Sequence, residues 1–209
     1  MTKRLFCILL TSTLAVLSWG QTAQEIVSRM DEAMAKVKSD NFAFTMDIKM
    51  PIVGTVTSRA YSWGDKTRLE MVEDGNPVTT WIDGPTEWTY YPSKNEIEIA
   101  PHELKESSSQ TTDNMEMFKG ITRGYDVKLR KETPTEWHIR CKKNRSNTEK
   151  DDPKTMDLIV AKDTYMPVSL STKMSMVTVT LRDVDFNVTE EMVTFDPAKY
   201  PTAKIVDKR

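Results

Sequence analysis

The sequence predicts a single α+β domain that is mainly β, an antiparallel sheet of ten or eleven strands with one N-terminal helix. Three observations support this prediction. From Asn41 onward, hydrophobic residues alternate with polar ones along most of the chain, which is the period of half-buried strands. Turn residues interrupt this alternation at short, regular intervals, as expected for antiparallel neighbours. A clear helical period precedes the first strand.

The helix is predicted over residues 22–38. Thr22 and Glu25 fit the S/T-x-x-E capping box, which satisfies backbone N–H groups at a helix start. Hydrophobic residues then follow at helical spacing: Ile26, Met30, Ala33, Met34 and Val37. The polar face carries acidic as well as basic residues, which favours packing on a sheet over binding a membrane surface.

The strands are predicted between turns that contain Gly, Pro, Asn or Asp. They span residues 42–50, 55–63, 67–73, 78–83, 87–91, 96–100, 125–131, 136–142, 156–160, 168–176 and 177–184, with a last piece near 186–188. Residues 101–114 are polar and interrupt the series, and a small apolar group of Met115, Met117 and Phe118 follows them directly. Two interpretations stay open for this insert: a short helical lid, or a flexible connection with one helical turn pinned to the core.

Residues 1–20 predict a secretory signal peptide. Lys3 and Arg4 precede an apolar stretch, and Ser18 and Gly20 are small residues at the −3 and −1 positions of a cut before Gln21. The stretch is shorter than the ~20 apolar residues of a membrane span. We therefore expect residues 21–209 to form an exported, soluble domain.

Composition argues against several functions. The 209 residues include 29 Lys and Arg against 31 Asp and Glu, so there is no clustered basic excess for nucleic acid. Removal of residues 1–20 leaves 27 basic and 31 acidic residues and one cysteine, Cys141, which cannot form an internal disulfide. Cys141 alternates with Trp137 and Ile139, which predicts a buried, inert thiol.

No motif predicts catalysis. His102 begins H-E-L-K-E, which lacks the second His of a zinc helix, and His138 falls on the polar side of its strand. The Asp151-Asp152 pair lies in a charged loop and is expected to be solvated. We therefore expect no catalytic residue, no metal and no cofactor, although carboxylates brought together from separate strands leave an envelope hydrolase as a remote hypothesis.

Methionine is frequent, with 13 residues in the whole chain. Several occupy inward strand positions: Met46, Met71, Met156, Met174 and Met176. Met is unbranched and adaptable, so it serves both as a core filler and as the lining of a surface that accepts varied apolar partners. Periodicity does not distinguish these two interpretations.

Several motifs resemble the periplasmic outer-membrane lipoprotein carrier family, which is called LolA-like. They are Trp63 followed by Arg68-x-Glu70, the segment 83–92 (DGPTEWTYYP) and the segment 195–197 (FDP). The resemblance implies an incomplete antiparallel β-barrel of about eleven strands. The N-terminal helix and a short helical lid would cover its concave apolar face, where acyl chains bind.

The resemblance also implies a function. It suggests a non-enzymatic, monomeric periplasmic carrier and chaperone that moves acylated lipoproteins from the inner to the outer membrane. Its partners would be an inner-membrane ABC-type lipoprotein release complex and an outer-membrane receptor or the membrane surface. The alternative is an envelope sensor that binds lipid or lipoprotein and acts through a protein partner. The candidate lining residues are Phe44, Met46, Ile48, Met71, Trp81, Trp88, Tyr90, Ile97, Met115, Met117, Phe118, Met174 and Met176.

One segment departs from the family pattern. In the best-studied branch, an Arg shortly before the third strand closes the lid by bonding helix carbonyls, whereas residues 63–66 here are Trp-Gly-Asp-Lys. Arg68 matches a neighbouring family position and is not assigned the lid role.

Overall fold

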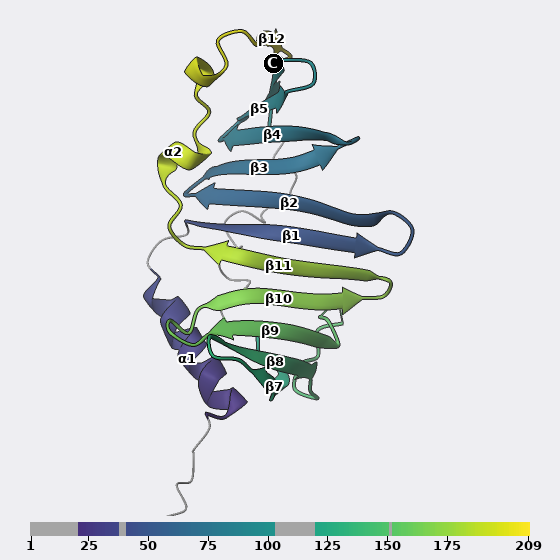
Figure 1. Ribbon diagram of the computed structural model, residues 1–209, viewed down its shortest axis with the longest axis vertical. Coiled ribbons are helices and arrows are strands. Elements are labelled where there is room, and N and C mark those ends of the chain that lie inside the picture. The colour runs from purple at the N-terminus through teal and green to yellow at the C-terminus, as the bar shows by residue number, and fades with distance from the viewer. Residues whose placement is uncertain (1–20, 38–40, 103–119, 151) are drawn as a thin grey trace, which may run out of the picture.

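The computed structural model describes residues 21–37, 41–102, 120–150 and 152–209 (Figure 1). The predicted signal peptide and the apolar insert with Met115, Met117 and Phe118 lie outside these residues, and so does Asp151. None of the helices in the described ranges is long and apolar enough to cross a membrane.

One open sheet of twelve strands organises the chain, in the order β12-β6-β5-β4-β3-β2-β1-β11-β10-β9-β8-β7 (Figure 1). Every pairing is antiparallel except that of β12 with β6. Because β12 and β7 are the two edges of this order, the predicted incomplete antiparallel barrel is confirmed. The strands are β1 Phe42–Met50, β2 Gly54–Trp63, β3 Lys66–Glu73, β4 Asn76–Asp83, β5 Thr86–Tyr91, β6 Glu96–Pro101, β7 Tyr125–Glu132, β8 Glu136–Lys143, β9 Thr155–Ala161, β10 Pro167–Met174, β11 Val177–Asp185 and β12 Lys204–Asp207.

The end of the chain differs from the prediction. Residues 186–188 are not a strand, because the chain leaves the sheet after Asp185 and crosses its face, where Val188 is buried against Ala43. A short helix, α2 (Glu190–Val193), and a 3-10 turn, η2 (Pro197–Lys199), follow. The chain then returns to the sheet as β12, a strand that the sequence pattern did not predict.

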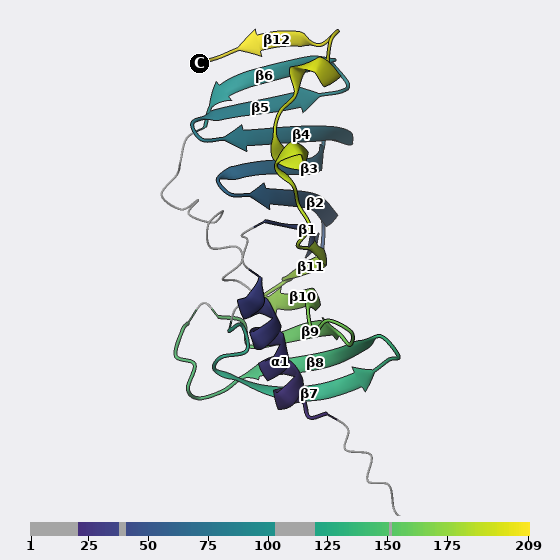
Figure 2. The same ribbon diagram turned by 90° about the vertical axis from the view of Figure 1, so that its left-hand side faces the viewer.

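Helix α1 (Ala23–Lys36) begins as predicted. The backbone N–H of Glu25 donates to the Thr22 hydroxyl at 3.2 Å, and the N–H of Thr22 donates to the Glu25 carboxylate at 3.0 Å. Ile26, Met30 and Met34 are fully buried beneath the helix. The helix lies across the β7–β10 half of the sheet (Figure 2), which confirms that its apolar stripe packs on strands.

Strand register assigns every side chain to one of two faces, because directly paired residues point to the same side. Phe44, Ala60 and Leu69 pair in succession across β1, β2 and β3 on the side that α1 covers, which we call the α1 face. Tyr61 and Arg68 pair on the opposite side, where the segment after β11 packs. We call this side the C-terminal face.

The main core lies between α1 and the α1 face of β1 and β7–β11. Its buried strand residues include Trp137, Ile139, Cys141, Met156, Leu158, Val160, Leu170 and Leu181. Burial raises the pKa of the Cys141 thiol to about 11, so the expected buried cysteine is confirmed in a setting that disfavours the thiolate.

The C-terminal face of the same half is polar. The Arg182 guanidinium donates to Asp47 across the β11–β1 pairing at 2.7 Å, and Arg140 pairs with Asp157 between β8 and β9. The hydrogen bond from Arg182 holds the pKa of Asp47 below its ordinary value. His138 also lies on this face, as its strand period predicted. One half of the sheet therefore has an apolar side beneath α1 and a charged side toward solvent.

Candidate functional site

An apolar strip continues from the core across the α1 face of β1–β4. It consists of two rows of directly paired residues: Phe44, Ala60, Leu69 and Thr80 in one row, and Met46, Ser58, Met71 and Val78 in the other. Ala60 and Ser58 on β2 have small side chains and lie between larger side chains on β1 and β3. The side chains of the strip therefore extend least from the sheet along β2. We call these eight residues the apolar strip.

The strip is most accessible on β3, since Phe44 on β1 and Val78 on β4 are both buried. At the β1 end, Phe44 is 8 % exposed, stacks on Phe42 with ring centroids 5.8 Å apart, and belongs to the main core. Further out, Leu69 and Met71 on β3 are only half-buried. Figure 2 shows α1 over the lower half of the sheet and away from β3–β5. In the described part of the chain, the strip thus runs out from beneath α1.

The structure brings four of the predicted lining residues to this face. Phe44, Met46 and Ile48 follow one another on the same side of β1, and Met71 lies two strands away on the same face. Sequence reasoning missed Leu69, Ala60 and Val78. Leu69 is two residues from Met71 on β3, Val78 pairs with Met71, and Ala60 pairs with Leu69.

Four other predicted lining residues lie on the opposite side, so the expectation of one common lining is wrong for them. Arg68 pairs with Trp81, Trp81 pairs with Trp88, and Tyr90 pairs with Ile97, all on the C-terminal face. The reason is strand register. Alternation within one strand separates its side chains into two faces, but it does not show which of these faces lies beside the apolar face of the neighbouring strand.

Met174 and Met176 lie at the β10–β11 turn rather than over the strip. Their exposed fractions are 49 % and 72 %, so neither is part of a closed lining. A lining role for Met115, Met117 and Phe118 remains a prediction, since these residues lie outside the described ones.

The aromatic residues of the C-terminal face are covered by the chain itself. Phe195 lies 5.4 Å from Trp81 and 5.5 Å from Trp88, centroid to centroid, and nearly parallel to Trp88. Tyr200 packs on Tyr90 at 4.5 Å. These rings therefore serve to hold the C-terminal segment, residues 186–203, on the sheet.

Two cations on β3 hold α2 to the same face. Arg68 donates to the backbone carbonyl of Met192 at 3.3 Å and lies over the ring of Tyr61. The Lys66 ammonium lies 2.8 Å from the Glu190 carboxylate, and this hydrogen bond raises the pKa of Lys66. Arg68 thus bonds a helix carbonyl, but the helix is α2 and not one on the α1 face.

Each of the two histidines lies beside a glutamate. The ring of His102 lies 3.2 Å from the Glu87 carboxylate, and His138 lies 3.4 Å from Glu136. No group of three or more His, Cys, Asp or Glu residues within residues 21–37, 41–102, 120–150 and 152–209 could hold a metal ion.

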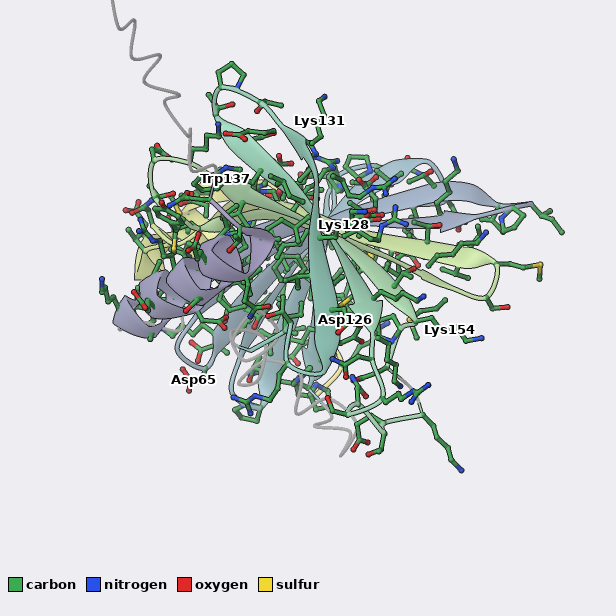
Figure 3. All side chains as sticks on the ribbon, turned by 90° about the horizontal axis from the view of Figure 1, so that it is seen from below. Asp65, Asp126, Lys128, Lys131, Trp137 and Lys154 are labelled. Carbon is green, nitrogen blue, oxygen red and sulfur yellow. The ribbon has the colours of Figure 1, made fainter. Side chains whose placement is uncertain are left out.

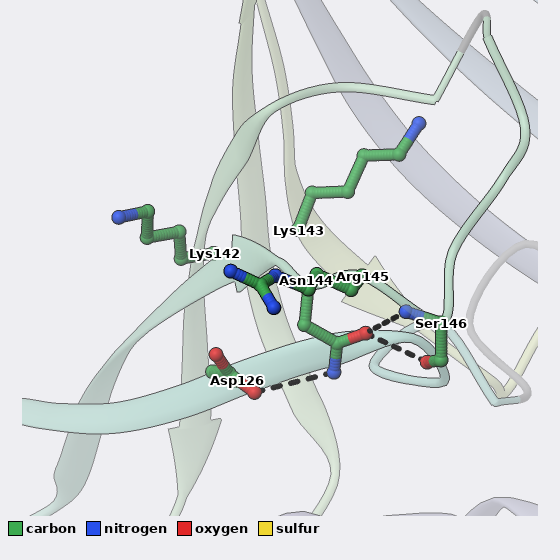
Figure 4. A pocket seen from close by; sticks show the side chains of 6 residues that line it. All are labelled: Asp126, Lys142, Lys143, Asn144, Arg145 and Ser146. Atoms are coloured by element: carbon green, nitrogen blue, oxygen red, sulfur yellow. Dashed lines mark hydrogen bonds between the residues drawn. The ribbon is translucent and has the colours of Figure 1, made fainter.

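One surface hollow, of about 700 Å³, is lined by polar and charged side chains (Figure 4). It lies where the turn after β8 meets β7, and the Asn144 amide joins the two by donating to Asp126 at 3.2 Å. Its lining residues are Asp126, Lys142, Lys143, Asn144, Arg145 and Ser146. An acyl chain gains nothing from such a lining, so the apolar strip is the better candidate site.

Fold and strip together define an open single-sheet protein with an apolar surface on one face. No family model matches the sequence, and no curated protein matches it. Similar solved structures include an uncharacterised conserved protein from Thermus thermophilus, with 18 % identity and a TM-score of 0.41, over 90 % of this chain and 100 % of that one.

The similar structures also include a LolA superfamily protein from Nitrosomonas europaea, with 15 % identity and a TM-score of 0.32, over 85 % of this chain and 99 % of that one. A third is MucB in complex with MucA, with 13 % identity and a TM-score of 0.39, over 83 % of this chain and 60 % of that one. The neighbours thus include the family that the sequence motifs resemble.

Proposed function

We propose that this protein binds acyl chains of lipids or lipoproteins on the apolar strip and carries lipoproteins through the periplasm. The observation that supports this most is the continuity of the strip, from the buried Phe44 beneath α1 to the half-buried Met71 on β3. An acyl chain would lie against the half-buried Leu69 and Met71 of β3 and keep its headgroup in solvent.

The chemistry of the strip suits reversible capture. Burial of hydrocarbon contributes about 0.8 kcal/mol per CH₂, without a directional requirement. Met46 and Met71 have unbranched side chains that adapt to different chain shapes. Such a surface would hold a chain well enough for transport and still release it, and it needs no catalytic group, metal or cofactor.

The transport route is part of the proposal. Cleavage before Gln21 would deliver the domain to the periplasm, where an inner-membrane ABC-type complex would load it with a lipoprotein. An outer-membrane receptor, or the membrane itself, would accept the cargo. The support for these partners is the motif resemblance alone.

Lipopeptide binding by matched variants tests the site. Met71 and Val72 are neighbours on β3 whose side chains point to opposite faces, and Val72 is 59 % exposed. We expect Met71→Gln to weaken binding of a fluorescent triacylated lipopeptide by roughly tenfold, since a polar amide replaces apolar contact. Val72→Gln should bind like the wild type. Equal affinity for both variants would argue against the strip.

Native mass spectrometry tests the cargo. Protein purified from the periplasm after overexpression of a lipoprotein should retain acyl-bearing cargo. If neither this cargo nor an added lipopeptide binds, the proposal is wrong. A sensor would also bind the lipopeptide, but it would not pass the chain on to outer-membrane vesicles, so a transfer assay separates the carrier from that alternative.

A further inference from the structure

Two neighbouring hairpin turns project beyond the same ends of the strands and carry exposed apolar side chains. The β1–β2 turn presents Ile52 and Val53, which are 97 % and 69 % exposed, and the β10–β11 turn presents Met174 and Met176. The turns are adjacent because β1 pairs with β11, and both reach beyond the neighbouring strands in Figure 1. We call these four residues the apolar tips.

Large apolar residues at such positions are unusual, since turns commonly use Gly, Pro, Asn, Asp and Ser. An exposed Ile or Met side chain gains favourable free energy when it is transferred from water to an apolar environment. None of the four contributes to the main core beneath α1. Their place at the tips is therefore not explained by folding.

Lysines flank the tips. Lys49 on β1 and Lys173 on β10 both pair with Thr178 of β11, so they stand on one face immediately behind the turns. Lys154 precedes β9, which pairs with β10, and Figure 3 places it on the side to which the hairpins project, away from Asp65. In the part of the chain that the structure describes, none of these three lysines forms an ion pair.

Some acidic side chains near the tips accept hydrogen bonds from other residues, and others lie on the β3 side of the hairpins. Asp47, two residues before Lys49, accepts hydrogen bonds from Arg182 and Thr57. Glu73 and Asp74 lie on the β3–β4 turn, on the other side of β2. The tips therefore have a basic flank on the β10–β9 side and an acidic one on the β3 side.

We propose that the apolar tips dock on a lipid bilayer that contains anionic headgroups, with Ile52, Val53, Met174 and Met176 inserted at the interface. Lys49, Lys154 and Lys173 would contact the headgroups and add electrostatic attraction to an anionic surface. The three flanking lysines form no ion pair in the described residues and complement anionic headgroups, and this favours an anionic membrane as the partner. This surface is separate from the apolar strip and goes beyond acyl-chain binding.

Vesicle flotation tests the proposal. We expect the purified protein to float with phosphatidylethanolamine–phosphatidylglycerol vesicles and to bind phosphatidylcholine vesicles much less. The double variants Ile52→Ser/Val53→Ser and Met174→Ser/Met176→Ser should each lose roughly tenfold in partitioning. Ile205→Ser is the matched control, because Ile205 is 52 % exposed on β12 at the far edge of the sheet, and it should float normally.

A fluorescent label reports insertion directly. An environment-sensitive dye on Met176→Cys should shift to shorter wavelength with anionic vesicles, whereas a dye on Ile205→Cys should not; the buried Cys141 will not compete for the label. The proposal is overturned if the wild type does not float, or if the control loses as much as the tip variants. It is also overturned if the tips prove to mediate a dimer in sedimentation. Lipopeptide binding by the tip variants should be unchanged, so failure here leaves the acyl-chain proposal standing.

Discussion

The guanidinium of Arg68 on β3 donates a hydrogen bond to the backbone carbonyl of Met192 in α2, 3.3 Å away. The two residues are 124 positions apart, so this bond fixes a late segment of the chain to an early strand. The same guanidinium lies 5.1 Å from the ring centroid of Tyr61 and 5.8 Å from that of Trp81. Arg68 thus joins the backbone of α2 to the aromatic surface beneath it.

Arg68→Met should loosen the C-terminal segment. The change removes the hydrogen bond to Met192, the ion pair with Glu70 and two cation–π contacts, and we expect the free energy of unfolding to fall by about 1–3 kcal/mol. Urea unfolding measures this loss. Limited proteolysis should also cut residues 186–203 sooner. Arg209→Met is the control, because Arg209 pairs with Asp207 at the surface and its loss should leave the free energy of unfolding nearly unchanged.

Phe195→Leu should weaken the same attachment through packing alone. Leu keeps hydrophobic contact but loses the stacked contact with Trp88 and the edge contact with Trp81. We expect the free energy of unfolding to fall by about 1–2 kcal/mol. Tryptophan fluorescence should change in the folded protein, because two of its tryptophans lose their aromatic neighbour. An unchanged emission spectrum with unchanged stability would contradict the assigned contact.

Asp31→Asn should stabilise the protein at neutral pH. Burial raises the pKa of Asp31, opposed by a backbone hydrogen bond from Gly120 and by the charge of Arg123. Because the folded-state pKa is raised, the ionised carboxyl lowers the free energy of unfolding at pH values above its pKa. The protonated carboxyl, at lower pH, does not. We expect the melting temperature at pH 7 to rise by about 2 °C, and the gain to vanish at a pH below both pKa values. Glu32→Gln, an exposed neighbour, is the control.

Cys141 should be inert in the folded protein. Its thiol is fully buried and its pKa is raised to about 11, so the reactive thiolate is scarce at pH 8. A colorimetric thiol reagent should therefore react only after urea unfolds the chain. Rapid reaction of the folded protein would mean either that Cys141 is accessible or that Cys7 has been retained.

Local pattern predicted most of this fold. The capping box at Thr22 and the period-two runs from β1 to β11 depend on neighbouring residues, so they are visible in a single sequence. Strand β12 has only four residues, of which Ile205 is exposed, so its alternation carries little signal. Pairing partners far apart in the chain, such as β1 with β11, have no local signature either.

The sequence contains enough information to predict that the candidate lining residues divide between two faces of the sheet. Asp74 and Gly75 both have positive φ, as a two-residue type I′ turn requires, and this turn pairs Glu73 with Asn76. Counting back from that pair places Met71 and Trp81 on opposite faces. Helix α1 covers one face and the C-terminal segment covers the other. The alternation of residues within a strand does not predict which segment packs on which face.

The pairing of β1 with β11 has a consequence for folding. Strands β1–β6 and β7–β11 form two meanders, and within each every strand pairs with its sequence neighbour. The meanders meet only where residues 43–49 pair with 178–185, and β12 then returns to β6. Loop closure over such separations is slow, whereas hairpins form quickly. We therefore expect each meander to form early and their junction to limit the rate, so that a nascent chain stays incompletely folded until its last thirty or so residues are available.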